Sequence, residues 1–150
     1  MDWISLWELL TGMTTENEFC TLSAQEMLRA YADKSLSPVD VMKAHLKRAE
    51  RANPDINALF SLRAESALKH ARASQDRWVR NAPQGPLDGV PVLLKDSIKC
   101  IGFDYFHGSA GYLGTPATED APPAARVKEA GGIIFAKTTR TYDAASAKRF

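Results

Sequence analysis

The chain has 150 residues, of which 45% are hydrophobic and 25% are charged, and these proportions exclude a disordered or fibrous protein. With 19 basic and 18 acidic residues the net charge is +1, so no strong field favours nucleic acid or an anionic membrane as a partner. The two cysteines, Cys20 and Cys100, lack a metal-binding or redox spacing. We therefore expect no metal, no cofactor and a reducing, cytoplasmic location.

Residues 1–12 are expected to form an amphipathic N-terminal extension. Apolar side chains at helical spacing share one face of it: Trp3, Leu6, Trp7 and Leu10. The extension is too short to cross a bilayer, which takes about 20 apolar residues, and it lacks the basic start of a signal peptide. Two roles stay open, packing within the protein and contact of Trp3 and Trp7 with a membrane surface. The true start is either Met1 or Met13.

Two helix starts follow in quick succession. Ser23 and Glu26 form a capping box, which satisfies two main-chain amides at the start of a helix. Ser37 before Pro38 marks the next start, because proline suits the first helical position. The apolar stripe of this second helix is predicted to end before Asn53–Pro54.

A third helix, rich in alanine, is predicted over residues 63–80, after an extended or connecting segment at residues 55–61. His45 and His70 lie within the predicted helices and have no partner at metal-ligand spacing. We interpret this helical region as scaffold.

The segment GPLDGVPVLLKDS, residues 85–97, changes the character of the chain. Its apolar run, Val90 to Leu94, predicts a strand buried on both faces, with Pro91 near its start. Lys95 and Asp96 then lie where the strand ends. Functional groups gather at the carboxyl ends of strands in open α/β sheets, so Lys95 is the candidate catalytic residue. The alternative is a lysine that simply reaches solvent at a strand end.

A long segment rich in glycine and aromatic residues, residues 98–118, comes next, and loops of this length are usually functional. His107 and Ser109 are too close in sequence to predict a nucleophile and its base. The glycines also lack the spacing of a phosphate-binding loop.

A helix and a second strand complete the pattern. Asp120 is the expected N-cap, prolines occupy the first turn, and Gly131 and Gly132 end the helix. A buried strand, Ile133 to Ala136, is expected to end at Lys137. Strand, helix and strand in this order predict two parallel strands in one sheet, with room for another strand between them.

Three segments in this order resemble the amidase signature family: GPLDGVPVLLKDS, GSAGYL at residues 108–113, and DAPPAARVKEAGGIIFAKTT at residues 120–139. The similarity runs from about Leu22 to Thr139. It implies an α/β fold, with N-terminal helices followed by the first strands of a mixed, helix-covered sheet. The chain then divides into the extension at 1–12, the N-terminal part of an amidase-signature domain at 13–139, and a polar tail at 140–150 without resemblance to the family.

The resemblance also implies a mechanism. Members of the family cleave or transfer small-molecule amides with a serine nucleophile, a second serine and a lysine. Lys95 occupies the lysine position of the pattern GxPxxxKD, and its implied role is general base, which burial favours because a base must be neutral. Asp96 is expected to fix the local turn and Lys137 to be a cation at a strand end.

Both serines of the family come from a segment rich in glycine and serine that this sequence lacks. The tail RTYDAASAKRF predicts a truncated or frame-altered ending, in an incomplete domain that is inactive alone. The alternative hypothesis is a non-catalytic remnant or an interaction fragment whose N-terminal helices contact a partner. The sequence gives no indication of an oligomeric state.

Overall fold

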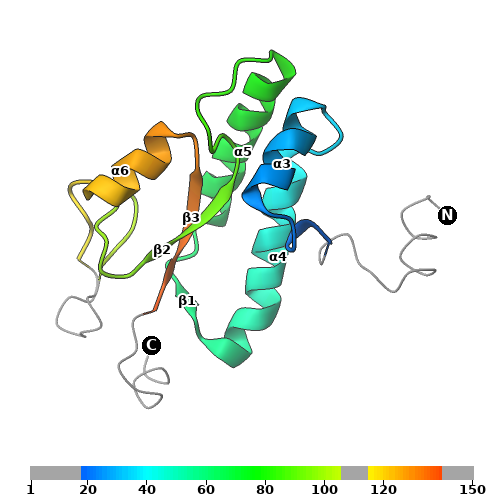
Figure 1. Cartoon of the computed structure of the whole chain (residues 1–150). Helices are drawn as coiled ribbons and strands as arrows, with labels where there is room; N and C mark the ends of the chain where they lie inside the picture. Colours follow the sequence, from blue (N-terminus) through cyan, green and yellow to red (C-terminus); the bar gives the residue numbers. More distant parts are fainter. Residues whose placement is uncertain (1–17, 106–114, 140–150) are drawn as a thin grey trace.

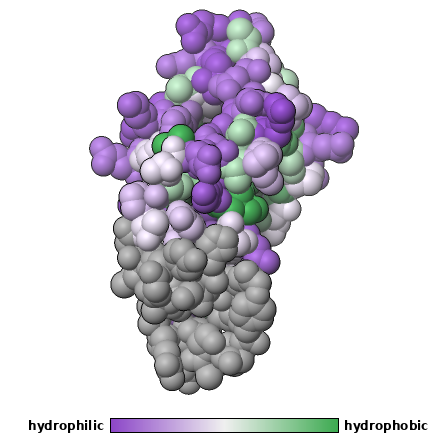
Figure 2. All heavy atoms as spheres, turned by 90° about the vertical axis from the view of Figure 1, so that its left-hand side faces the viewer, coloured by the Kyte–Doolittle hydropathy of each residue, from purple (hydrophilic) through white to green (hydrophobic). Residues whose placement is uncertain are grey.

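The computed structural model describes residues 18–105 and 115–139. Within them a small mixed sheet has helices on both faces (Figure 1). The predictions for residues 1–12, for GSAGYL with His107 and Ser109, and for the tail at 140–150 lie outside the described residues. Seen from the side of α6, hydrophilic side chains dominate the described surface (Figure 2).

Helix α3, Ala24–Ala32, begins as predicted. The Ser23 hydroxyl accepts a hydrogen bond from the Glu26 amide at 3.3 Å, and the Glu26 carboxylate accepts one from the Ser23 amide at 2.7 Å. The capping box is therefore confirmed. Met27 and Tyr31 of this helix are buried against Val41 and Val90, which attaches α3 to the segment that leads into the sheet.

Helix α4, Pro38–Ile56, begins at the predicted place, where the Ser37 hydroxyl accepts a hydrogen bond from the Val39 amide at 3.0 Å. The buried stripe of α4 ends at Ala49, before Asn53–Pro54 as predicted, although the helix itself continues to Ile56. A proline in the last turn removes only one amide donor, and the Asn57 amide still donates to the Asn53 carbonyl at 2.7 Å. Asn57 itself adopts a left-handed conformation that ends the helix.

Strand β1, Leu59–Phe60, and helix α5, Ala64–Val79, follow. Strand β2, Pro91–Lys95, and strand β3, Ile133–Thr138, are direct neighbours and parallel, while β1 pairs with the end of β3 in antiparallel orientation. The strand order is β1-β3-β2. The predicted parallel pair and the mixed, helix-covered sheet are confirmed.

The burial predicted for the first strand is met only in part. β3 is buried along most of its length, whereas in β2 only Leu94 is fully buried and Leu93 is 43% exposed. The reason is position, because in the described residues β2 lies at the edge of the sheet and β3 lies between two strands. Neighbours on both sides remove a strand from solvent.

A register shift interrupts the pairing of β2 with β3. Val92 pairs with Ile134, but the next residue, Leu93, pairs with Ala136, so Phe135 is one extra residue on β3. Such an insertion changes the alternation of side chains. Phe135 and Ala136 consequently both pack on the face covered by α4 and α5, and Lys137 is paired with Leu94, which packs on the face covered by α6.

Helix α6, Pro122–Glu129, covers the second face through Ala124 and Val127. The prediction that Asp120 caps this helix is wrong, since the cap position is Ala121 and no side chain caps the helix. Prolines at the first two helical positions have no amide to offer a cap. The Asp120 carboxylate accepts hydrogen bonds instead from Lys128 and from the Ile101 amide.

Candidate functional site

The carboxyl ends of β2 and β3 form one edge, and Lys95 is the last residue of β2 there. Lys95 pairs with Thr138 on β3. The Asp96 amide continues the ladder by donating to the Thr138 carbonyl at 3.0 Å, and the Ile98 amide closes a turn by donating to the Lys95 carbonyl at 3.1 Å. Asp96 is 1% exposed. The backbone that carries Lys95 is thus fixed on both sides.

The Lys95 side chain is exposed. Successive residues of a strand point to opposite faces, and Leu94 packs toward α6. The Lys95 side chain therefore points to the face covered by α4 and α5, the same face as that of the half-exposed Leu93. The structure places Lys95 at the predicted strand end, with its side chain exposed.

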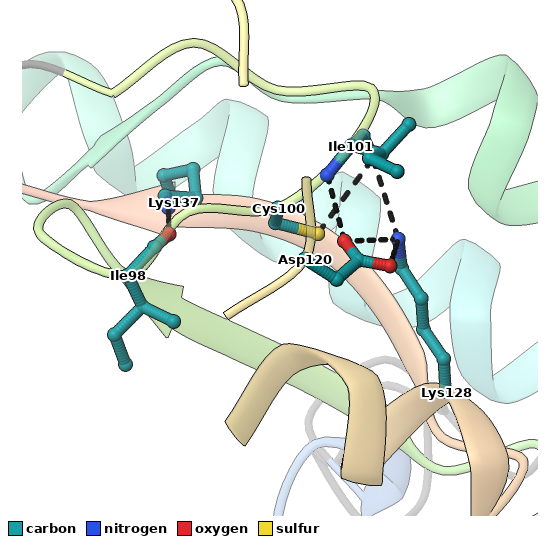
Figure 3. Close-up of polar contacts among 6 residues, drawn as sticks. All are labelled: Ile98, Cys100, Ile101, Asp120, Lys128 and Lys137. Carbon is teal, nitrogen blue, oxygen red and sulfur yellow. Dashed lines mark hydrogen bonds and ion pairs between the residues drawn. The ribbon is translucent and has the colours of Figure 1, made fainter. Parts of the chain in front are cut away.

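Lys137, near the end of β3, is the buried lysine of this edge, with 0% of it exposed. Its ammonium group donates a hydrogen bond to the Ile98 carbonyl, in the turn that follows β2 (Figure 3). Burial lowers the pKa of Lys137, and the nearby charge of Asp96 opposes that shift. Lys137 lies near the end of β3, but its side chain turns inward and joins the two strand ends inside the protein.

The sequence contains one sign of this burial, which the prediction of a strand-end cation did not use. Lys137 directly follows four buried residues, Ile133 to Ala136, and long stems such as that of lysine often lie along apolar surface. Which of the two lysines is buried depends on the register shift at Phe135, which no local pattern reveals.

A polar cluster lies beside this edge on the face of α6. The Asp120 carboxylate accepts hydrogen bonds from the Ile101 amide at 2.7 Å and from Lys128 at 2.8 and 2.9 Å (Figure 3). Cys100 is fully buried next to it, and burial raises the pKa of its thiol. A buried thiol with a raised pKa is a poor nucleophile, so the cluster fixes the loop between β2 and α6.

Asp88 organises the other end of the strand, where the chain enters β2. Its side chain is fully buried and accepts two hydrogen bonds from Arg77 and one from the Gln84 amide. Burial alone raises the pKa of an aspartate, but these donors outweigh burial and hold the pKa of Asp88 below its usual value. This pair anchors the segment GPLDG and was not predicted.

The described part of the chain offers no cluster for a metal ion. In residues 18–105 and 115–139, no three His, Cys, Asp or Glu side chains are grouped so that they could hold one. None of the helices in these same ranges is long and apolar enough to cross a membrane.

His45, in α4, is partly buried, and burial lowers its pKa, while one ring nitrogen lies 3.0 Å from the Val41 carbonyl.

Known proteins match this chain over most of its length. The family model described as Amidase matches residues 40–146. An acylamidase of Rhodococcus erythropolis is 32% identical over 124 residues, and an acetamidase of Aspergillus oryzae is 32% identical over 127 residues. Each match covers 83% of this chain, but only 26% of the acylamidase and 23% of the acetamidase.

Solved structures agree with these matches. A crystal structure of an amidase has a TM-score of 0.71 and 33% identity, and the match covers 78% of this chain and 26% of that protein. A fatty acid amide hydrolase shares the fold, with a TM-score of 0.79 at 22% identity over 92% of this chain and 25% of that protein. The chain thus spans about a quarter of the length of its relatives.

Proposed function

Because the chain belongs to the amidase family, we propose that these 150 residues supply the lysine-bearing part of an amidase site, with Lys95 as general base. The observation that carries the proposal is the position of Lys95. It ends β2 within the pattern Gly-x-Pro-x-x-x-Lys-Asp, residues 89–96, on a backbone held by hydrogen bonds to β3 and to the following turn. The substrate class would be small-molecule carboxylic amides.

In the proposed reaction, the neutral amine of Lys95 accepts a proton from a bridging serine, which takes one from the nucleophilic serine. The nucleophilic oxygen bonds to the amide carbonyl carbon, and the carbon–nitrogen bond breaks as the proton returns to the leaving amine. Water then cleaves the acyl-serine ester and releases the acid. Main-chain amides would stabilise the charge on the carbonyl oxygen in both steps.

The two serines would come from the glycine- and serine-rich segment typical of the family, which is absent from this sequence. A lysine acts as a base only when neutral, and burial favours the neutral form. Lys95 is exposed and lies on the same face as the 43% exposed Leu93. We propose that the serine-bearing part of an amidase domain covers this face, and that the 150 residues alone do not hydrolyse amides.

The second candidate function is a non-catalytic interaction fragment that uses its helices. Its contacts would include exposed apolar side chains at helix ends, such as Ile56 of α4 (65% exposed) and Val79 of α5 (60% exposed), and single side chains of this kind are common on protein surfaces in general. In that case Lys95 would have no chemical role.

A chimera distinguishes the two functions. Residues 22–139 would replace the matching segment of the Rhodococcus erythropolis acylamidase, and hydrolysis of simple acyl amides would be followed. We expect an active chimera, loss of at least about 100-fold in kcat for Lys95→Ala, and unchanged kcat for the control Lys99→Ala, a half-exposed lysine paired with Glu119. Equal activity of the chimera with and without Lys95 would refute the role of Lys95. The 150-residue chain, assayed alone on the same amides, is expected to be inactive.

A further inference from the structure

A groove with a volume of about 370 Å³ lies at the start of β3, remote from the strand ends that carry Lys95 and Lys137. Helix α5 forms one wall. Residues 101–103 and Lys128 of α6 form the other, and Gly131 to Ile134 form the floor. Ligand sites in proteins usually have volumes of about 300–1,000 Å³, so the groove is large enough for a ligand.

The wall formed by α5 and its N-cap residue Arg63 is one stripe along the helix. Its residues recur every three or four positions, which places them on one side of the helix: Arg63, Ser66, His70, Ala73 and Arg77. Arg63 and Arg77 are 14 positions apart, which corresponds to about 21 Å at 1.5 Å per residue. The groove is therefore long, and it suits an extended ligand better than a compact ion.

The groove presents positive charge. Arg63, Arg77 and Lys128 line it, and no Asp or Glu is among the described residues that do. Arg77 and Lys128 pair with Asp88 and Asp120, and in each pair the cation is more exposed than the carboxylate, at 26% against 0% and at 38% against 20%. The cations of the two pairs line the groove, whereas their carboxylates do not.

Arg63 is the cation best placed to bind an anion. Its Nε donates to the Gly102 carbonyl at 3.0 Å and its guanidinium lies 5.9 Å from the centre of the Phe103 ring. These contacts orient the group across the groove. Within residues 18–105 and 115–139, Arg63 has no carboxylate partner, so its two terminal nitrogens can form a bidentate pair with one.

The floor of the groove also offers a main-chain hydrogen-bond donor. Strand β1 pairs with β3 only at Lys137 and Thr138, and the Arg63 amide donates to the Phe135 carbonyl at 2.9 Å. The Ile133 amide donates toward β2, to the Val90 carbonyl. Because neighbouring amides of a strand point to opposite sides, the Ile134 amide is directed toward the groove, where the described residues place no strand.

We propose that this groove binds an acidic peptide segment of a partner protein in extended conformation. About six extended residues span 20 Å at about 3.3 Å per residue, which matches the separation of Arg63 and Arg77. Carboxylates of the peptide pair with Arg63, Lys128 and Arg77, and its main chain contacts β3 beside Ile134. Binding by charge complementarity weakens with salt.

The test uses the 150-residue chain and a fluorescein-labelled peptide, acetyl-Glu-Thr-Glu-Thr-Glu-Thr-amide, followed by fluorescence anisotropy. The control peptide carries Gln in place of each Glu. We expect the acidic peptide to bind at least about tenfold more tightly than the control in 50 mM NaCl, and to lose this preference in 500 mM NaCl. Equal binding of the two peptides, or no binding of either, would overturn the proposal.

Matched variants locate the binding. Arg63→Gln should weaken binding of the acidic peptide about threefold to fivefold, whereas Arg72→Gln, which removes the same charge from α5 outside the groove, should leave it nearly unchanged. His70→Glu adds a repelling charge at an exposed residue and should also weaken binding, with circular dichroism confirming the helix content of each variant. Equal effects of Arg63→Gln and Arg72→Gln, or tighter binding of octathymidylate than of the acidic peptide, would refute this site.

Discussion

Arg77 holds Asp88 through two parallel hydrogen bonds, from Nε to Oδ2 at 2.8 Å and from Nη2 to Oδ1 at 2.5 Å. The indole nitrogen of Trp78 also donates to the Asp88 carbonyl at 3.1 Å. Two consecutive residues of α5 thus hold one loop residue by its side chain and its backbone. This residue lies three positions before β2, so the pair positions the strand that ends at Lys95.

Asp88→Ala is expected to lower the free energy of unfolding at pH 7 by about 3 kcal/mol, because it leaves Arg77 without its buried partner. Urea denaturation would measure the loss. The control is Asp40→Ala, which removes an exposed aspartate paired with Lys43 and should cost less than about 0.5 kcal/mol. Similar losses for the two variants would show that the Asp88 pair contributes no more than a surface pair.

The same pair predicts a dependence on pH. The pKa of Asp88 is lower in the folded protein than in the unfolded chain, so its stabilisation is complete above the unfolded pKa of about 3.9. It is lost as the pH falls through the lower, folded pKa. Asp88→Asn should therefore reduce the acid-induced loss of unfolding free energy below about pH 4. Parallel pH profiles for the variant and the wild type would contradict the lowered pKa.

The two lysines at the sheet edge should respond differently to substitution. Lys137→Ala is expected to cost about 2–3 kcal/mol of unfolding free energy, because it empties a buried position and leaves the Ile98 carbonyl without its donor. Lys95→Ala, at an exposed position, should change it by less than about 0.5 kcal/mol. Thermal or urea unfolding of the two variants measures both changes. A larger loss of unfolding free energy for Lys95→Ala than for Lys137→Ala would contradict a structural role for Lys137.

Glycines at positive φ offer a third comparison. Gly131 has φ +87°, and a Cβ there would lie 2.7 Å from the Asp88 Cα, whereas Gly102 has φ +92° with nothing within 4 Å of the added atom. Gly102→Ala should cost about 1 kcal/mol from backbone strain alone. Gly131→Ala should cost at least about 3 kcal/mol, since it adds a clash with backbone. Equal melting temperatures would show that the Asp88 loop can move away.

Local signals in the sequence predicted the starts of helices and the parallel strands. The Ser23–Glu26 box and Ser37–Pro38 act within one turn of helix, so nearby residues determine them. Asp120 failed as a cap because prolines occupy the first two positions of α6, and its carboxylate accepts hydrogen bonds from the Ile101 amide and from Lys128 near the end of the same helix. The pair of Arg77 and Asp88 joins residues 11 positions apart, and the groove beside Arg63 joins segments from Arg63 to Ile134, so neither is encoded within one turn of helix.

The position of Lys95 at the end of β2 was predictable because the residues around it form a contiguous pattern. The burial of Lys137 was not, because it depends on how two strands align after a long connection. The exposure of Lys95 follows from the position of β2 at the edge of the described sheet, which the sequence of the strand does not specify.

The extra residue Phe135 keeps the side chains of Lys95 and Lys137 apart. If the pairing of Val92 with Ile134 continued in step, Lys95 would lie directly opposite Lys137, and directly paired side chains start about 5 Å apart. Two ammonium groups so close would repel each other. One inserted residue sends the two side chains to opposite faces of the sheet, so that Lys137 joins the two strand ends on the face of α6 while Lys95 stays exposed on the face of α4 and α5.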